Sequence, residues 1–521
     1  MPDTPAWVRD AVFYQVFTDR FAASERVAKP GPLEPWDAPP TNYGFKGGDL
    51  LGIVERLDHL TSLGVNAIYL TPVFQSASNH RYHTYDYLTI DPLLGGDAAL
   101  RELLDQAHER GIRLVLDGVF NHTGRGFWPF HHVLETGAAS PYRNWFLFDQ
   151  AGLDQQKPID AYPIGRLRSG QPLDEPWPDQ SDANPGSARE RLGYEAWWGI
   201  PALPKLNVAE PAVREYLWGV AEHWLRFGID GWRLDVPAEI DDAEFWAEFR
   251  RRCRSVNPEA YLVGEIWHVA PDWVSGDRFD ALMNYPLAKA VIGFVGGGSL
   301  NEPLLRSHHE YAQVTALDAP GFAARLGELL GAYAPETTAV QLNLLASHDT
   351  PRILSLLSGD REALELAVLL QMTLPGAPCI YYGDEVGVTG GMDPDNRGAF
   401  PWDASRWASE LFQSVRAMVA LRRSEPVLRA DGVQVVAASG SGLAYLRADG
   451  AETLAVALNV GDTETVVALT SGGAAPGGAP DGSFVLHATG RARVMPPRLT
   501  RSEGVLSIQL PPRSGAVIRL V

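Results

Sequence analysis

Carboxylates and histidines stand at the ends of four apolar runs, in positions that packing does not require. The four segments read Asp-Gly-Val-Phe-Asn-His at 117–122, Gly-Trp-Arg-Leu-Asp at 231–235, Gly-Glu-Ile-Trp at 264–267 and Ser-His-Asp at 347–349. Two carboxyl groups can cleave an acetal when one is ionised and attacks the anomeric carbon while the other donates a proton to the leaving oxygen. The pattern therefore indicates nucleophilic and acid–base chemistry on a sugar.

Arg233, Asp235 and Glu265 are the residues on which this hypothesis depends most. Residues two apart in a strand share a face, so Arg233 and Asp235 are expected to point the same way. The charge of Arg233 favours ionised Asp235, whereas desolvation beside Ile266 and Trp267 favours protonated Glu265. The alternative interpretation is a salt-bridge network that closes one end of the fold, but four aligned strand ends favour a catalytic site.

Short apolar runs alternate with amphipathic stretches through most of the chain. Candidate strands cover residues 11–17, 65–71, 113–120, 229–236, 261–267, 279–284, 339–346 and 379–383. Between the second and third strands, Leu100, Leu103, Leu104 and Ala107 recur at helical spacing. Eight apolar strands with helices between them predict an α/β fold, the (β/α)8 TIM barrel, whose active site lies at the carboxyl ends of the strands.

The barrel pattern is interrupted once and then ends. Residues 122–208 are rich in Trp, Pro, Gly and Asp, and they predict an inserted domain after strand 3. Residues 426–521 contain short strands and Gly-rich turns, which predict a C-terminal antiparallel β domain of sandwich type, with 471–482 as a surface loop. The catalytic barrel is then expected to comprise residues 1–121 and 209–425.

Composition narrows the class of ligand. The 521 residues include 44 Lys and Arg against 64 Asp and Glu, a formal net charge of −20. An acidic surface repels phosphate backbones, so we expect no nucleic acid partner and a neutral, hydroxyl-rich ligand. Only Cys253 and Cys379 occur, which excludes a disulfide framework. No signal-peptide pattern or membrane-length apolar run is found, so a cytoplasmic protein without membrane contact is predicted.

The four segments, in this order, resemble the motifs of the α-amylase superfamily of retaining glycoside hydrolases, family 13, and the similarity extends over essentially the whole chain. By that resemblance Asp235 is the nucleophile and Glu265 the general acid and base. Asp349 would bind sugar hydroxyls and stabilise the transition state. The resemblance also assigns substrate binding to Asp117, His122, Arg233, Glu239, Trp267 and His348.

Three further segments are similar to one branch of that family, the cyclomaltodextrinases, neopullulanases and maltogenic amylases. They are Leu-Pro-Lys-Leu-Asn at 203–207, the segment 391–397 with Asp393 and Arg397, and His80 with Tyr82. In the branch the matching Asp and Arg hold the sugar chain on the non-reducing side, and the Tyr stacks on the sugar being cleaved.

The resemblance implies hydrolysis of α-glucosidic bonds in small α-glucans such as cyclodextrins, maltooligosaccharides and pullulan-type or branched dextrins. An α-1,6-preferring debranching enzyme or a transglycosylase is the alternative. A non-catalytic relative on the same fold is disfavoured, because all three carboxylates are present. Loops 122–207 and 270–338 are expected to form the walls of a closed pocket around a short glucan.

The chain departs from the branch in three places. Its first strand is expected near residue 11, so we expect the N-terminal β domain through which longer members dimerise to be absent. The chain then resembles short forms such as a cyanobacterial debranching enzyme, and the oligomeric state, a homodimer included, is left open. Residues 21–30 are too poor in oxygen ligands for a calcium loop, so no metal and no cofactor is expected. Residues 236–239 read Val-Pro-Ala-Glu, where relatives place a small residue and Asn before Glu, so the linkage preference does not transfer.

Two features of the inserted segment have competing interpretations. His131 and His132, with Glu135 nearby, are interpreted as a surface or packing pair in preference to a metal site. Trp197 and Trp198 belong either to the core of the inserted domain or to a platform for sugar.

Overall fold

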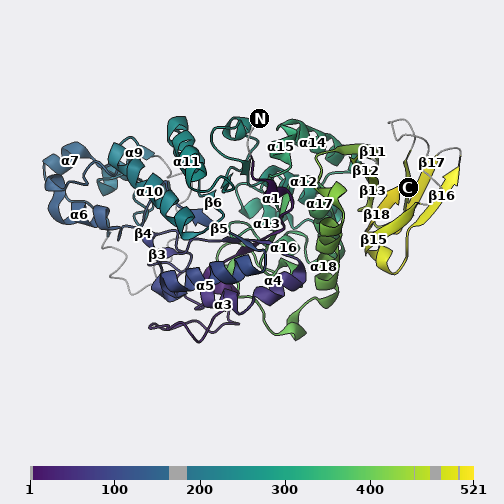
Figure 1. The fold of residues 1–521 in the computed structure, drawn as a ribbon, viewed down its shortest axis with the longest axis horizontal. Coiled ribbons are helices and arrows are strands. Elements are labelled where there is room, and N and C mark those ends of the chain that lie inside the picture. The colour runs from purple at the N-terminus through teal and green to yellow at the C-terminus, as the bar shows by residue number, and fades with distance from the viewer. Residues whose placement is uncertain (1–3, 163–184, 451, 470–482, 503–504, 521) are drawn as a thin grey trace.

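A computed structural model describes residues 4–162, 185–450, 452–469, 483–502 and 505–520. The barrel lies at the centre of the elongated molecule, with the inserted segment at one end and the C-terminal β domain at the other (Figure 1). Within the described ranges, no helix is long and apolar enough to cross a membrane.

Eight parallel strands form the central sheet, in the order β8-β7-β6-β5-β2-β1-β10-β9. An isolated parallel bridge between Met283 and Leu342 nearly closes it into a ring. This confirms the predicted TIM barrel. The strands are β1 (Phe13–Val16), β2 (Ala67–Leu70), β5 (Arg113–Gly118), β6 (Gly231–Leu234), β7 (Tyr261–Gly264), β8 (Ala281–Leu282), β9 (Leu342–Leu344) and β10 (Ala377–Tyr381).

Amphipathic helices cover the outside of the barrel. In α10 (Pro211–Phe227), Pro211 occupies the first turn, Val213, Leu217 and Val220 are buried, and Gly228 ends the helix at φ 117°. The other barrel helices are α1 (Ala6–Arg9), α2 (Thr18–Phe21), α3 (Leu50–Val54), α4 (Leu57–Leu63), α5 (Gly96–Glu109), α11 (Ala243–Val256), α12 (Tyr285–Gly296), α13 (Glu302–Ser307), α14 (Ala319–Gly331), α15 (Pro335–Thr338), α16 (Ile353–Leu356), α17 (Arg361–Thr373) and α18 (Ser409–Ser424).

The register of β5 against β6 positions the first two motifs. Asp117 and Arg233 are partners across these strands, so a carboxylate and a guanidinium face each other inside the barrel. Below them the barrel interior is filled by apolar side chains that include Phe13, Tyr261 and Val263. The polar layer therefore lies on a packed floor at the carboxyl ends of the strands.

The inserted segment follows β5 and carries α6 (Trp128–Thr136), α7 (Gln150–Asp154) and α9 (Pro185–Leu192). Its own core is aromatic: Phe130, Phe146, Phe148 and Tyr194 are buried against one another. A bridge between His122 and Lys205 joins its two ends at the barrel mouth. This small core holds the segment as a unit beside the active end of the barrel.

The C-terminal domain contains a five-stranded and a three-stranded antiparallel sheet, as the prediction of a β domain requires. The sequence predicts strands here at 434–436, 443–447, 454–457, 465–469, 484–488 and 505–510. It does not predict the strands at Arg498–Ser502 and Ser514–Leu520, nor a hairpin at 74–90 of the barrel. The expected loop, 471–482, lies outside the described ranges. The strands are β11 (Val433–Ser439), β12 (Gly442–Asp449), β13 (Glu452–Asn459), β14 (Thr465–Leu469), β15 (Phe484–Gly490), β16 (Arg498–Ser502), β17 (Val505–Leu510) and β18 (Ser514–Leu520), and the hairpin is β3 (Phe74–Ser76) with β4 (Thr84–Ile90).

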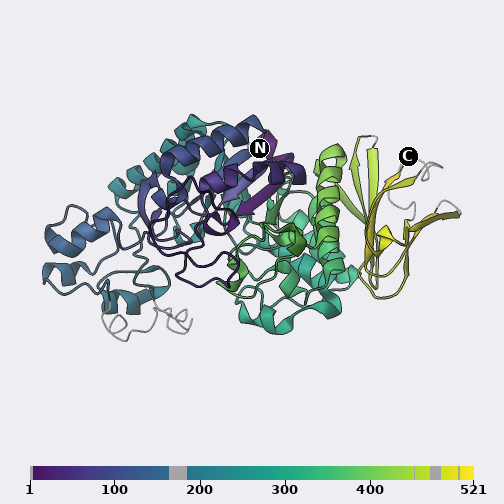
Figure 2. The same cartoon turned by 90° about the horizontal axis from the view of Figure 1, so that it is seen from below.

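The C-terminal domain lies against the helices on one side of the barrel, as Figure 2 shows, and its strand β15 contacts α17 and α18. Glu365 of α17 is buried and accepts hydrogen bonds from Ser414 Oγ, Thr489 Oγ1 and the Gly490 N–H. Arg493 pairs with the same carboxylate at 2.8 Å. Glu365 is thus one anchor of the domain, and Arg513, which pairs with Asp360 at 3.1 Å and donates to the Val295 carbonyl, is another.

Gly231 is a sharp test of the barrel register. A Cβ there would lie 2.2 Å from the carbonyl oxygen of Tyr261 on β7. We expect Gly231→Ala to lower the free energy of unfolding by about 1–3 kcal/mol, because the strands must move apart. Gly219→Ala in α10, where a Cβ meets nothing within 4 Å, should be neutral or stabilising. Equal thermal stability of the two variants would contradict the register.

Candidate active site

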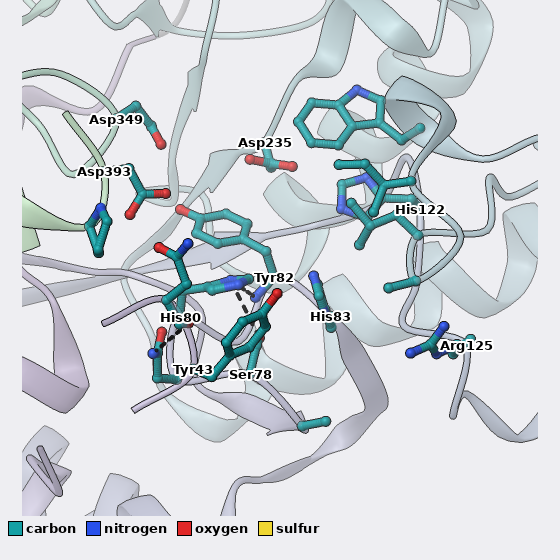
Figure 3. Close-up of a pocket in the computed structure, with 18 of the residues that line it drawn as sticks. Tyr43, Ser78, His80, Tyr82, His83, His122, Arg125, Asp235, Asp349 and Asp393 are labelled. Carbon is teal, nitrogen blue, oxygen red and sulfur yellow. Dashed lines mark hydrogen bonds between the residues drawn. The ribbon is translucent and has the colours of Figure 1, made fainter. Parts of the chain in front are cut away.

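A pocket of about 460 Å³ opens at the carboxyl ends of the strands and contains the predicted carboxylates (Figure 3). Asp235 and Glu265 lie on its floor side, directly after β6 and β7, and Asp349 follows β9. The pocket is walled by loops from distant parts of the chain. The residues that line it include Arg20, Asn42, Tyr43, Ser78, His80, Tyr82, His83, Tyr85, His122, Arg125, Tyr162, Trp197, Leu203, Val236, Asp393 and Arg397.

Arg233 organises the carboxylates from below, although it does not itself line the pocket. Its Nη1 lies 2.9 Å from both Asp117 Oδ1 and Asp235 Oδ1, and its Nη2 lies 2.9 Å from Glu265 Oε2. Asp349 Oδ2 is 4.0 Å from the same Nη2. The predicted shared face of Arg233 and Asp235 is confirmed, and four carboxylates converge on one buried guanidinium.

The backbone after Asp235 is strained in a way that serves Glu265. Val236 adopts φ 36° and ψ 51°, a left-handed conformation that is unusual for a β-branched residue. In this conformation the Val236 N–H donates to Glu265 Oε2 at 2.9 Å, while Trp267 Nε1 donates to Oε1 at 3.2 Å. Trp267 therefore positions Glu265 with a hydrogen bond, in addition to the desolvation expected from the sequence.

The site holds protons more tightly than free carboxyl groups would. Burial raises the pKa of Asp235 well above its usual value; Arg233 opposes this effect, and repulsion from Glu265 adds to it. Burial likewise raises the pKa of Glu265, and burial with repulsion from Glu265 raises the pKa of Asp349 to about 7. Arg233 does favour ionised Asp235, as predicted, but it is shared among too many carboxylates to outweigh burial. The cluster can therefore carry a proton near neutral pH.

The hairpin loop between β3 and β4 delivers His80 and Tyr82. Arg81 between them is buried and donates from Nε to Asp91 at 2.7 Å, which anchors the loop. The Tyr82 hydroxyl lies 2.9 Å from Asp117 Oδ2 and 2.5 Å from His348 Nε2, and its ring stacks on that imidazole. Tyr82 thus joins the first and last motifs at the pocket.

Arg397 ties a second loop to the catalytic end of the pocket. It pairs with Asp393 at 3.0 Å and with Asp349 at 3.6 Å, and its Nε donates to the His348 carbonyl. Asp393 and Arg397 both line the pocket, as the resemblance implied. Their mutual ion pair leaves this wall polar but close to neutral.

Two expectations need revision or refinement. Among the described residues that line the pocket none falls in 270–338; the wall expected there is built by 41–43 and 393–397. The reason is that 270–338 folds largely into helices against the barrel. It meets the inserted segment where the rings of His309 and Trp198 lie 6.0 Å apart. Glu239 lies off the pocket lining and pairs with Lys205 at 3.0 Å at the rim.

The competing interpretations of the inserted segment are resolved by its contacts. His131 pairs with Glu135 at 3.6 Å, and the described residues contain no cluster that could hold a metal ion. Trp197 lines the pocket and stacks on His122, with centroids 5.0 Å apart and planes 11° apart. Trp198 is 37% exposed. Trp197 is therefore pocket wall, and Trp198 stacks on it from outside the lining; neither belongs to the buried core of the insertion.

Sequence reasoning missed several pocket residues that lie outside the motifs. Asn42 and Tyr43 come from the long segment before α3, and Arg125 and Tyr162 come from the insertion. A weak signal existed for Arg125, because Gly-Arg-Gly at 124–126 begins one residue after the first motif. Nothing local distinguishes Tyr43 or Tyr162 from ordinary surface tyrosines.

Comparison with known proteins agrees with this geometry. The family described as alpha amylase, catalytic domain, matches residues 15–424. The chain belongs to the α-amylase family of glycoside hydrolases. It is 41% identical over 459 residues to a cyclomaltodextrinase of Geobacillus thermopakistaniensis, covering 87% of this chain and 69% of that protein.

Two crystal structures superpose on this member of the α-amylase family over nearly its full length. A protein of Thermus thermophilus gives a TM-score of 0.86 at 46% identity, with 99% of this chain and 100% of that chain covered. The native debranching enzyme of Nostoc punctiforme gives 0.85 at 43% identity, with 100% of both chains covered. The resemblance to short members of the family is thereby confirmed.

Because the pKa of Asp349 is raised in the folded state, this residue should lower the free energy of unfolding by an amount that depends on pH. The folded state holds this proton up to about pH 7, whereas the unfolded chain releases it near pH 3.9. Stability from this group is therefore present at low pH and lost as the pH rises towards 7. Asp349→Asn should raise the melting temperature by roughly 1–3 °C at pH 8 and much less at pH 4.5. Thermal unfolding at both pH values measures this, and exposed Asp105→Asn is the control. A gain that is equal at both pH values would contradict the shift.

Proposed function

We propose that this α-amylase-family protein is a retaining hydrolase that cleaves α-glucosidic bonds in cyclodextrins, maltooligosaccharides and short branched dextrins. The observation that carries the proposal is the convergence of Asp235, Glu265 and Asp349 on Arg233 in one pocket. The names of the relatives, a cyclomaltodextrinase and a debranching enzyme, support small α-glucans as the substrate class.

Each carboxylate has a distinct proposed role. Asp235 attacks the anomeric carbon as the glycosidic bond breaks, and the proton of Glu265 passes to the leaving oxygen. Water then gives a proton to Glu265 and attacks the same carbon, which releases Asp235. Asp349 accepts hydrogen bonds from sugar hydroxyls and stabilises the positive charge of the transition state. Binding of substrate displaces water from the pocket, which strengthens these interactions.

The nucleophile is tested by Asp235→Asn. The substitution keeps the shape of the side chain and removes its charge, so turnover should fall by roughly five orders of magnitude with the fold unchanged. Activity on the preferred substrate and the circular dichroism spectrum measure the two effects. Retention of more than a few per cent of activity would show that another group attacks.

The proton donor is tested by Glu265→Gln with two kinds of leaving group. Sugar leaving groups need protonation, so their cleavage should fall by about 10²–10⁴-fold. An activated aryl glycoside should keep far more of its rate, because its leaving group departs as an anion. A parallel loss on both substrates would assign Glu265 a binding role instead.

Linkage preference is the finer question, and α-1,6 debranching is the second candidate. It is favoured by the full-length superposition on the Nostoc enzyme, whereas the cyclomaltodextrinase favours the general α-1,4 class. Pullulan separates the two, because panose as product means α-1,4 cleavage and maltotriose means α-1,6 cleavage. A pocket of about 460 Å³ has room for only a few sugars, so it also predicts higher kcat/KM on β-cyclodextrin or branched maltooligosaccharides than on soluble starch. If soluble starch were the best substrate, an open cleft would be required.

We also propose that the enzyme works without calcium, because ammonium groups already occupy the oxygens of the segment after β1. Lys46 Nζ donates to the carbonyls of Pro35 and Ala38 at 2.7 Å and lies 3.3 Å from Glu34 Oε2. Lys29 Nζ lies 2.9 Å from Asp49. Oxygens that already bind a lysine ammonium group are not free to coordinate a hard cation such as calcium.

Chelation and substitution together test this arrangement. EDTA should change neither the melting temperature nor activity, since no bound ion would stabilise the native state. Lys46→Met should lower the melting temperature, because it leaves buried oxygens without a donor, whereas exposed Lys157→Met should not. A large fall of the melting temperature in EDTA would reveal a calcium site.

The cytoplasmic location remains a prediction from the sequence, and the oligomeric state remains open.

A further inference from the structure

Arg125 lies just after His122, and its backbone is pressed against an aromatic ring. A Cβ on Gly124 or Gly126, its two neighbours, would lie 2.5 Å or 2.6 Å from ring atoms of Tyr85. The Arg125 N–H donates to the Ala202 carbonyl at 3.2 Å. Only glycine permits this approach on both sides. The segment is therefore fixed so that Arg125 is the side chain it presents to the pocket.

The guanidinium of Arg125 rests on Tyr162. Its central carbon lies 4.3 Å from the centroid of the Tyr162 ring, and its Nη1 donates to the Ala161 carbonyl at 2.7 Å. This cation–π contact orients a planar group that carries five N–H donors. Tyr162 is 45% exposed, and both side chains line the same pocket as Asp235.

The position of the pair indicates which part of a substrate it meets. Figure 3 places Asp349 and Asp393 at one end of the pocket and His122 and Arg125 at the other, with Asp235 between them. Asp393 is expected on the non-reducing side, so Arg125 lies on the leaving-group side; this step rests on the proposed function. His122, stacked on Trp197, lies nearer the carboxylates, and Arg125 with Tyr162 lies beyond it.

We propose that Arg125 and Tyr162 bind the second sugar of the leaving group, which one sugar separates from the bond that is cleaved. The aromatic ring offers a surface for the apolar face of a pyranose, and the edge of the guanidinium donates to its hydroxyl and ring oxygens. The same place would hold an acceptor sugar. In transfer, the acceptor hydroxyl gives its proton to Glu265, its oxygen bonds to the anomeric carbon, and Asp235 leaves.

The experiment compares substrates that differ only in what occupies the leaving-group side. α-Maltosyl fluoride releases fluoride, which cannot reach Arg125, whereas β-cyclodextrin and pullulan place sugars there. For Arg125→Ala and Tyr162→Ala, kcat/KM on the better of these two glucans should fall about tenfold. Fluoride release should change less than twofold, and transfer from the fluoride to added maltose should fall about tenfold.

Matched variants separate binding from folding. Tyr162→Phe keeps the ring and should behave as wild type, and Arg191→Ala removes an exposed arginine that also donates to a carbonyl, that of Gly199. Equal losses on the fluoride and the glucan would overturn the proposal, because they would place the effect on the other side or on the fold. No loss on either would overturn it as well. Fluoride release that survives in Asp235→Asn would instead refute the nucleophile, so the two failures are distinguishable.

Discussion

The active end of this barrel depends on one guanidinium that is completely buried. Arg233 has no exposed surface, and three carboxylates, Asp117, Asp235 and Glu265, lie within 3 Å of its terminal nitrogens. Without that charge, burying the carboxylates would cost several kcal/mol each. Burial still raises the pKa values of the three carboxyl groups, but the charge of Arg233 opposes that rise and holds the groups in place. The alternation of side chains along β5 and β6 can be read from the sequence. The pairing of the two strands sets Asp117 opposite Arg233, and Arg233 then binds the carboxylates of both motifs.

The cost of the site appears as strain and repulsion close to the reacting groups. Val236 takes a left-handed conformation directly before Pro237, although the proline ring sterically disfavours α conformations in the residue before it. The gain is an N–H aimed at Glu265. Stability elsewhere supports this arrangement, through the large apolar core outside the barrel and the domain anchored at Glu365. A strained residue beside repelling carboxylates is what a site selected for chemistry rather than stability would show.

Much of this organisation could be predicted, and the failures have a common cause. Strand period and motif position were enough to place Asp117, Asp235 and Glu265 at one barrel mouth, because parallel strands end at the same edge. β18 was missed because Ser514 and Gly515 begin it and it pairs in the middle of a sheet, where burial overrides propensity. The wall at Asn42 and Tyr43 was missed because long-range contacts hold it: Asn79 donates to the carbonyls of Asn42 and Gly44. No local pattern encodes such a contact.

The charge distribution inside the pocket suits a neutral sugar, although the protein as a whole is acidic. Burial lowers the pKa of His83 to about 4 and that of His122 to about 3, and it holds the pKa of His80 well below the usual value. These imidazoles are therefore uncharged at neutral pH and offer one donor and one acceptor each, which matches hydroxyl groups. Among the described residues that line the pocket or lie beneath it, full charges stand on the floor around Arg233, at the Asp393–Arg397 pair, and at Arg20 and Arg125. The carboxylates are thus gathered around Arg233, where the bond breaks, and the imidazoles and aromatic rings of the walls add uncharged hydrogen-bonding groups and apolar faces for the sugar.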